Sequence, residues 1–172
     1  MLGIYKFLSS YINNPEAVGS LVPSSSFLGK EIASGIKNFN PETVLLEFGA
    51  GTGAITKYLP ENTVSVEVNK DFVLLLNKKF PDRKIIDGNA IQLLLEIKEP
   101  VNIISSIPLI NNPFAREFRE AINKANSKNL IKNLVTFSYG YNSPLSNCGF
   151  ERSVRLKTVF FNIPPANVWK YW

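Results

Sequence analysis

From residue 43 onward, short apolar runs rich in Val and Ile alternate with segments in which apolar residues recur every three or four positions. The runs have the length and composition of buried strands, and the other segments have the period of amphipathic helices. The expected strands are 43–48, 63–68, 84–87 and 101–107, and the expected helices are 54–59, 71–80, 90–97 and 113–125. This alternation predicts a parallel sheet covered on both faces.

The pattern changes after Ser127. Three strand-like segments, 130–140, 153–163 and 166–172, are separated by turn residues, and none has a helical period. They predict an antiparallel strand pair that closes one edge of the sheet. The expected fold is therefore α/β, with a mostly parallel seven-stranded sheet and an antiparallel edge.

The first forty residues have a different pattern, which predicts a helical segment over 1–40 ahead of a domain over 41–172. An apolar stripe at helical spacing consists of Ile4, Phe7, Leu8, Tyr11 and Ile12. A second helix is expected from Phe27 to about Lys37, and the Gly, Pro and Ser residues between the two helices favour an ordered loop.

Composition limits the possible partners and locations. The chain has 172 residues and a formal net charge of +5, which attracts polyanions such as nucleic acid or acidic lipid headgroups without separating the two. No run approaches the ~20 apolar residues of a membrane-spanning helix, and no signal-peptide pattern begins the chain. Together with the single Cys148, this predicts a cytoplasmic protein.

A glycine-rich turn provides the first candidate site. The strand at 43–48 ends in Gly49-Ala50-Gly51-Thr52-Gly53 and leads directly into a helix pattern. Such a turn lets the backbone approach a ligand and points free amides at its polar groups. Glu67 ends the next strand, where a carboxylate can accept hydrogen bonds from both hydroxyls of a ribose. The pair predicts a nucleoside site.

The glycines alone also fit the dinucleotide fingerprint or a tight turn without a ligand. Two neighbouring features favour a different ligand. Glu47 stands two residues before Gly49, where its carboxylate would meet the ammonium of an amino acid and would repel a pyrophosphate. Gly88-Asn89-Ala90 follows the third strand and offers a side-chain amide to an adenine edge.

The segments EFGAGTG, VEVN and DGNA resemble, in order and spacing, the successive motifs of class I S-adenosylmethionine-dependent methyltransferases, over about residues 43–110. That family more often has aspartate in place of Asn69 and Asn89. The resemblance implies a Rossmann-like fold with S-adenosylmethionine as cofactor. It implies a cofactor site made of Ser24, Ser25, Glu47, Gly49, Ala50, Gly51, Gly53, Glu67, Val68, Gly88, Asn89, Ala90 and Ser105.

The loop after the fourth strand bears on the acceptor. In enzymes that methylate adenine or cytosine, this strand ends in Asn or Asp, then Pro, then an aromatic residue that stacks on the flipped base. This chain has Ser105-Ser106-Ile107-Pro108-Leu109, which keeps the proline without the amide or the ring. A nucleic acid partner is therefore not favoured.

A second resemblance covers more of the chain. INNPEAVGSLVPSSS, SSIPLI, FSYG and NIPPANVWKYW are similar, in this order, to segments of the short bacterial phospholipid N-methyltransferases. It implies successive methylation of phosphatidylethanolamine toward phosphatidylcholine by a protein bound peripherally to anionic lipid on the inner face of the membrane. Residues 1–40 would then dock on the membrane, which we favour, or cover the active site.

The chemistry needs no histidine, of which the chain has none, and we expect no metal. A neutral amine is already nucleophilic, so alignment and exclusion of water are the main requirements. The expected catalytic residues are Tyr139, Ser105 and Ser106, and the expected substrate contacts are Pro108, Tyr141, Arg152 and Arg155. The serines equally suit strand capping, and exposed arginines are often only solvated. An rRNA adenine N6-methyltransferase and a catalytically idle cofactor- or membrane-binding protein remain the alternatives.

Overall fold

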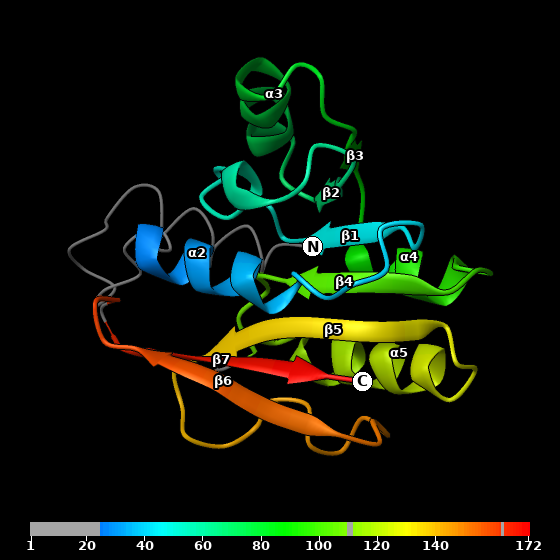
Figure 1. Cartoon of the computed structure of the whole chain (residues 1–172). Coiled ribbons are helices and arrows are strands. Elements are labelled where there is room, and N and C mark those ends of the chain that lie inside the picture. The colour runs from blue at the N-terminus through cyan, green and yellow to red at the C-terminus, as the bar shows by residue number, and fades with distance from the viewer. Residues whose placement is uncertain (1–24, 110–111, 163) are drawn as a thin grey trace.

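The computed structural model describes residues 25–109, 112–162 and 164–172, and in this part of the chain seven strands form one sheet (Figure 1). The strands are β1 (Leu45–Phe48), β2 (Val64–Glu67), β3 (Ile85–Asp87), β4 (Val101–Ser105), β5 (Ile131–Ser138), β6 (Ser153–Val159) and β7 (Ala166–Tyr171). Their order across the sheet is β3-β2-β1-β4-β5-β7-β6. The first five strands are parallel, and β7 runs antiparallel between β5 and β6. The predicted mostly parallel sheet with an antiparallel edge is confirmed.

The helices cover both faces of the sheet (Figure 1). They are α2 (Ser26–Gly35), α3 (Lys70–Lys79), α4 (Ala90–Glu96) and α5 (Ala115–Asn126). On one face, α4 and α5 pack against alternate strand residues such as Ile103 and Leu134. On the other face, α2 packs against the intervening residues, including Ile104 and Val135. This alternation follows from the two-residue period of a strand.

Helix α2 belongs to the core although it falls within the predicted 1–40 segment. Leu28 and Ile32, one turn apart, are fully buried against the sheet. The predicted division at residue 40 stays a prediction, and the predicted apolar stripe from Ile4 to Ile12 lies outside the described residues. Within the described residues, no helix has both the length and the apolar character needed to span a membrane.

The helix expected at 54–59 is wrong in type, because only a short 3-10 helix, Thr56–Tyr58, forms there. Leu59 is extended, with ψ at 157°, and is followed by Pro60. A proline ring clashes with an α-helical conformation of the residue before it, so an α-helix cannot continue through this point.

The sheet has one exposed edge at β6. Residues 151–157 are all exposed, and the pairing of β6 with β7 shifts register between Arg155 and Lys157. Residues 160–162 follow the end of β6, and residues 164 and 165 precede β7, on the left of Figure 1.

Candidate cofactor and acceptor site

The loops predicted to hold a ligand meet at the carboxyl edge of the sheet. Phe48 of β1 pairs with Val66 of β2 and with Ser105 of β4, so these three strands end side by side. Glu67 pairs with Asp87, which brings the end of β3 to the same edge. Ligands of open parallel sheets bind at this edge, outside the ends of the strands.

The glycine loop has one open position. Gly49, Gly51 and Gly53 have φ of 75°, 55° and 80°, a region that favours glycine. A Cβ on Gly53 would lie 2.5 Å from Cε2 of Phe80, and one on Gly49 would lie 3.1 Å from Cγ1 of Ile107. Among the described residues, a Cβ on Gly51 would meet only the Gly49 carbonyl oxygen, at 4.0 Å. Gly49 and Gly53 therefore allow packing within the protein, whereas Gly51 faces open space that a ligand can enter.

Glu67 is held against this loop. Its Oε2 accepts a 2.8 Å hydrogen bond from the Gly51 amide, and its Oε1 accepts hydrogen bonds from the amides of Val68 and Asn69, both at 2.9 Å. Only 5% of Glu67 is exposed, while 43% of Val68 is exposed beside it. The site thus pairs a fixed acceptor for hydroxyl groups with an apolar surface suited to a flat ring.

The loop after β3 adds an amide donor. Asn89 is the N-cap of α4, and its Oδ1 accepts a 2.8 Å hydrogen bond from the Ile91 amide. This bond fixes the plane of the exposed side chain and leaves its Nδ2 group as the donor for a ligand. The Gly88 amide donates to the Glu67 carbonyl at 3.0 Å, which ties this loop to β2, and Ala90 begins α4 as a buried residue.

The carboxylate of Glu47 lies inside the protein. It accepts hydrogen bonds from Oγ of Ser65 at 2.6 Å and from Oγ1 of Thr56 at 2.9 Å, and it is fully buried. Burial raises the pKa of Glu47 above its ordinary value of 4.5, against the opposing effect of the two hydroxyl donors. Its predicted contact with the ammonium of an amino acid stays a prediction.

The two serines after β4 have different environments. Ser105 is buried, its Oγ accepts a 3.4 Å hydrogen bond from the Ile107 amide, and its carbonyl accepts one from Oγ1 of Thr136 at 2.9 Å. The Oγ of Ser106 is buried without a hydrogen-bond partner among the described residues. A buried polar group without a partner requires an explanation, and a ligand hydrogen bond provides one here. Ser106 is therefore the better candidate for ligand contact.

Tyr139 follows β5 at the same edge of the sheet and packs against the core on the α2 face. Its ring makes an edge contact with Phe137, with 5.6 Å between centroids, and the Asn162 side chain is close enough to its hydroxyl to lower the pKa of Tyr139. Burial raises the pKa of Tyr139 above its ordinary value of 10.0. The phenol therefore keeps its proton near neutral pH, which suits positioning of a substrate better than acceptance of a proton.

Asn162 is a candidate functional residue that the sequence did not single out. It lies in the turn between β6 and β7, only 2% exposed. Its Oδ1 accepts a 3.1 Å hydrogen bond from the Ser25 amide, and its Nδ2 donates to the Pro164 carbonyl at 2.8 Å. It connects the start of α2, the turn and Tyr139, and its one sequence signal is its position just before Pro164-Pro165.

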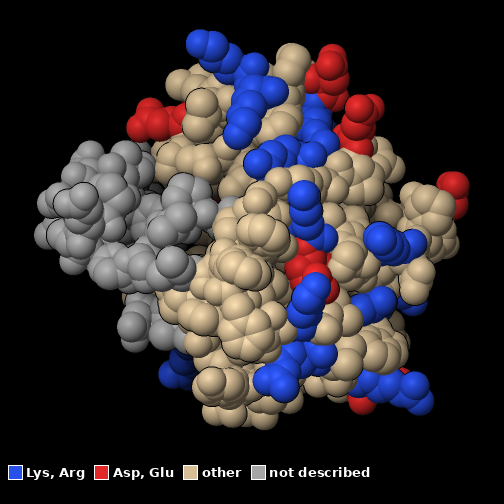
Figure 2. Space-filling view, turned by 60° about the vertical axis from the view of Figure 1, so that its left-hand side comes forward, with Lys and Arg blue, Asp and Glu red and all other residues tan. Residues whose placement is uncertain are grey.

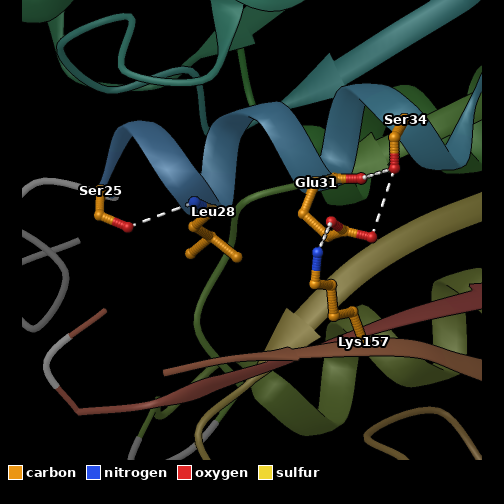
Figure 3. Close-up of polar contacts among 5 residues, drawn as sticks. All are labelled: Ser25, Leu28, Glu31, Ser34 and Lys157. Atoms are coloured by element: carbon orange, nitrogen blue, oxygen red, sulfur yellow. Dashed lines mark hydrogen bonds and ion pairs between the residues drawn. The ribbon is translucent and has the colours of Figure 1, made fainter. Parts of the chain in front are cut away.

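Ser25 caps α2. Its Oγ accepts a 3.2 Å hydrogen bond from the Leu28 amide (Figure 3). This accounts for a serine here without a ligand, and its implied part in the cofactor site stays a prediction. Ser24 lies outside the described residues.

The predicted substrate contacts are only partly brought together. Pro108 lies in the loop after β4, where its carbonyl accepts a 2.8 Å hydrogen bond from the Asn112 side chain. Tyr141 lies two residues past Tyr139 and is 84% exposed. Both residues lie at the carboxyl edge of the sheet, and their contact with a substrate stays a prediction.

The two arginines are placed elsewhere, and their predicted grouping with Tyr139 is corrected. Arg152 exchanges backbone hydrogen bonds with Trp172 at the amino edge of the parallel strands, opposite the glycine loop, because β6 begins at that edge. Arg155 pairs with Trp169, which packs on the α4 and α5 face, whereas Tyr139 packs on the α2 face.

Comparison with known proteins gives two kinds of relative, and no family model matches the chain. An ornithine lipid N-methyltransferase of Singulisphaera acidiphila is 28% identical, over 66% of this chain and 66% of its own length. Ribosomal RNA small subunit methyltransferase A of Coxiella burnetii is 32% identical, over 48% of this chain and 35% of its own length. The chain thus spans about two thirds of the first relative and about a third of the second.

Solved structures share the fold at low sequence identity. TrmN from Thermus thermophilus has a TM-score of 0.63 at 11% identity, over 95% of this chain and 52% of its own. A S-adenosylmethionine-dependent methyltransferase from Clostridium acetobutylicum has a TM-score of 0.51 at 16% identity, over 88% and 63% of the two chains. CalS10 from Micromonospora echinaspora, solved with S-adenosylmethionine, has a TM-score of 0.52 at 16% identity, over 89% and 62%. This chain has the class I S-adenosylmethionine-dependent methyltransferase fold.

The carboxyl edge fits the cofactor of that methyltransferase fold. Gly51 leaves room for a ligand, and Glu67 presents a fixed carboxylate to hydroxyl groups. Val68 and Asn89 supply an exposed apolar surface and an amide donor on the adjoining loops. Ser106 adds a buried hydroxyl without a partner among the described residues.

Proposed function

We propose that this protein is an S-adenosylmethionine-dependent N-methyltransferase whose acceptor is the amine of phosphatidylethanolamine and of its mono- and dimethyl forms, leading to phosphatidylcholine. The observation that carries the proposal is the loop Ser106-Ile107-Pro108-Leu109, which lies against the glycine loop. A Cβ on Gly49 would be 3.5 Å from the Ile107 amide nitrogen. At this place beside the cofactor site, the loop offers a hydroxyl and apolar groups but no ring to stack on a base.

The cofactor contacts follow from the geometry of the edge. Glu67 would accept hydrogen bonds from the ribose hydroxyls, with Val68 against the adenine ring and Asn89 at its edge. The amides of residues 49–53 would face the methionine part of the molecule. When bound, S-adenosylmethionine supplies an electrophilic methyl group on a sulfonium, and the residues of this chain bind and orient the two reactants.

The chain's own groups account for the rest of the reaction. The lipid ammonium would first lose a proton to water, and the neutral amine would then form a new N–CH3 bond as the S–CH3 bond breaks, with S-adenosylhomocysteine as the leaving group. Tyr139 keeps its own proton and orients the amine through its phenol oxygen, and the Ser106 hydroxyl relays the released proton. The aromatic and apolar residues around Tyr139 and Ser106 would favour the methylated cations that form, since a cation over an aromatic face is stabilised by about 0.5–2 kcal/mol.

The lipid relative supports this acceptor, because the matched part covers more of this chain than the match to the ribosomal RNA enzyme. Peripheral binding to anionic lipid agrees with the net charge of +5. The RNA relative and the same charge favour methylation of rRNA adenine as the second candidate. The missing aromatic residue after Pro108 opposes it.

Transfer of label separates the candidates. The purified protein would be incubated with labelled S-adenosylmethionine and with phosphatidylethanolamine, its monomethyl form, or unmodified ribosomal RNA. We expect label in both lipids and little in RNA. Label in RNA alone would establish the second candidate, and no label in either would leave an idle binding protein.

A further inference from the structure

Three phenylalanine side chains are exposed at the end of the molecule that carries the candidate site. Phe160 and Phe161, in the turn after β6, are 74% and 76% exposed, and Phe27 in the first turn of α2 is 55% exposed. The rings of Phe27 and Phe161 lie 5.2 Å apart between centroids. We refer to Phe27, Phe160 and Phe161 as the phenylalanine patch. Grouped exposed apolar residues of this size mark interaction surfaces more often than single ones do.

The phenylalanine patch is connected to the part of the site that is proposed to hold the acceptor amine. Asn162 directly follows Phe161; its side chain accepts a hydrogen bond from the Ser25 amide and lies near enough to the Tyr139 hydroxyl to lower the pKa of Tyr139. Ser25 in turn caps the helix that carries Phe27. Because Asn162 is only 2% exposed and is bonded to Ser25, the patch is held at the start of α2, on the side of the molecule where β5 ends before Tyr139. Whatever surface the patch contacts therefore lies next to the proposed amine site.

The charges around the phenylalanine patch are basic. Lys30 is exposed one turn after Phe27 on the outer stripe of α2, and Lys157 on β6 is 63% exposed. The nearby acid, Glu31, is paired with Lys157 at 3.2 Å and is 19% exposed (Figure 3). On this end of the molecule, Lys and Arg side chains gather beside a large uncharged area (Figure 2). Exposed rings bordered by lysines match the surface of an anionic bilayer, with an apolar interior beneath negative headgroups.

We propose that the phenylalanine patch inserts into the surface of an anionic lipid bilayer, with Lys30 and Lys157 at the level of the headgroups. This orientation turns the carboxyl edge of the sheet toward the membrane, so that a lipid amine reaches Tyr139 without leaving the bilayer surface. The inference rests on the proposed lipid acceptor and names the surface that delivers it. The first 24 residues, which contain the predicted apolar stripe, are the other candidate for membrane binding, and the experiment separates the two candidates.

The test uses the full-length chain and vesicles of phosphatidylcholine with phosphatidylglycerol, which contain no acceptor amine. The variant Phe160→Ser, Phe161→Ser is compared with wild type and with Leu74→Ser. Leu74 is 69% exposed on α3 and serves as the control. Loss of two inserted phenyl rings should weaken the affinity for vesicles, measured by sedimentation, by about a hundredfold or more, since each buried ring contributes on the order of 1.5–3 kcal/mol and 1.4 kcal/mol is tenfold. The control should bind like wild type.

Equal binding of the double variant and wild type would overturn the proposal and assign membrane binding to the first 24 residues. Failure of wild type to bind these vesicles would overturn it as well. Thermal unfolding of the double variant should match wild type, because both rings are exposed. Because the vesicles contain no acceptor amine, this test measures membrane binding alone. A failure to methylate phosphatidylethanolamine in the separate transfer assay would contradict the proposed function and would not change the result for membrane binding.

Discussion

The backbone amide of Gly51 donates a 2.8 Å hydrogen bond to Oε2 of Glu67, so the glycine loop after β1 is fastened to the acid that ends β2. Two more amides, those of Val68 and Asn69, hold the other oxygen. These three amides occupy three of the carboxylate's roughly four lone-pair sites, and the remaining site, on Oε2, can accept a ligand hydroxyl. The acceptor for a ribose is thus in position before the cofactor arrives.

Replacing Glu67 should weaken cofactor binding strongly. Glu67→Ala removes a ligand hydrogen bond to a charged group, which contributes about 1.5–3 kcal/mol, so the dissociation constant should rise on the order of tenfold or more. Calorimetric titration with S-adenosylmethionine measures this change. Glu61→Ala, at an exposed turn residue, is the control and should bind normally. Equal affinity in the two variants would remove Glu67 from the site.

Two glycine substitutions should separate stability from binding. Gly53→Ala combines a φ of 80° with a Cβ 2.5 Å from Phe80, so it should lower the free energy of unfolding by about 2 kcal/mol or more. Gly51→Ala places its methyl group in open space and should cost only about 1–2 kcal/mol in backbone strain. Urea unfolding gives both values. Gly51→Ala should nevertheless bind S-adenosylmethionine poorly, because its methyl group would enter the space of the cofactor. Normal affinity would show that the cofactor does not occupy the open space at Gly51.

Glu47 should make stability depend on pH. Because burial raises its pKa, the folded protein keeps this proton to a higher pH than the unfolded chain does. The folded state then binds more protons in the range from the ordinary value of 4.5 up to the folded pKa, so the free energy of unfolding falls as pH rises through that range. Glu47→Gln cannot ionise and should lack this decline in urea titrations. Parallel profiles for the two proteins would contradict the prediction.

The cap of α2 should contribute to folding. Ser25→Ala removes the oxygen that accepts from the Leu28 amide and should lower the free energy of unfolding by about 1 kcal/mol. Ser34→Ala is a matched control in the same helix, since the Ser34 hydroxyl donates to the Glu31 carbonyl within the helix and makes no cap. Figure 3 shows both serines. Thermal unfolding should shift for the first variant and little for the second.

Tyr139→Phe should slow methyl transfer to phosphatidylethanolamine more than it weakens cofactor binding, since the phenol oxygen is proposed to orient the acceptor amine. Because burial raises the pKa of this phenol, the wild-type rate should show no ionisation of Tyr139 below about pH 10. Tyr141→Phe, at a largely exposed position, is the comparison. An unchanged rate for Tyr139→Phe together with a slow Tyr141→Phe enzyme would transfer the role to Tyr141.

The cofactor half of the site could be predicted because its parts are set by local rules. Val- and Ile-rich runs specify the parallel strands, and parallel strands that end together bring Gly51, Glu67 and Asn89 to one edge. Each of these residues lies within three positions of a strand end, so an error of one or two residues in the expected bounds does not move it away.

The acceptor half depends on relationships that span the sequence. The three carboxyl-terminal strands could be predicted, but their order, with β7 between β5 and β6, could not. This order determines the edge of the sheet at which Arg152 lies. Glu47 has hydroxyl partners from two other elements, and neither partner is marked by a motif. Asn162 was missed for the same reason, since its contacts reach 137 residues away to Ser25.

The exposed strand β6 gives Arg155 a role that requires no lipid phosphate. An edge strand offers unpaired backbone groups on which another chain can add a strand, and this is a common route to aggregation. Arg155 and Lys157 place charges along that edge, and the register shift between them interrupts the regular row of backbone groups. A basic edge that resists strand addition keeps separate copies of the chain apart at high concentration.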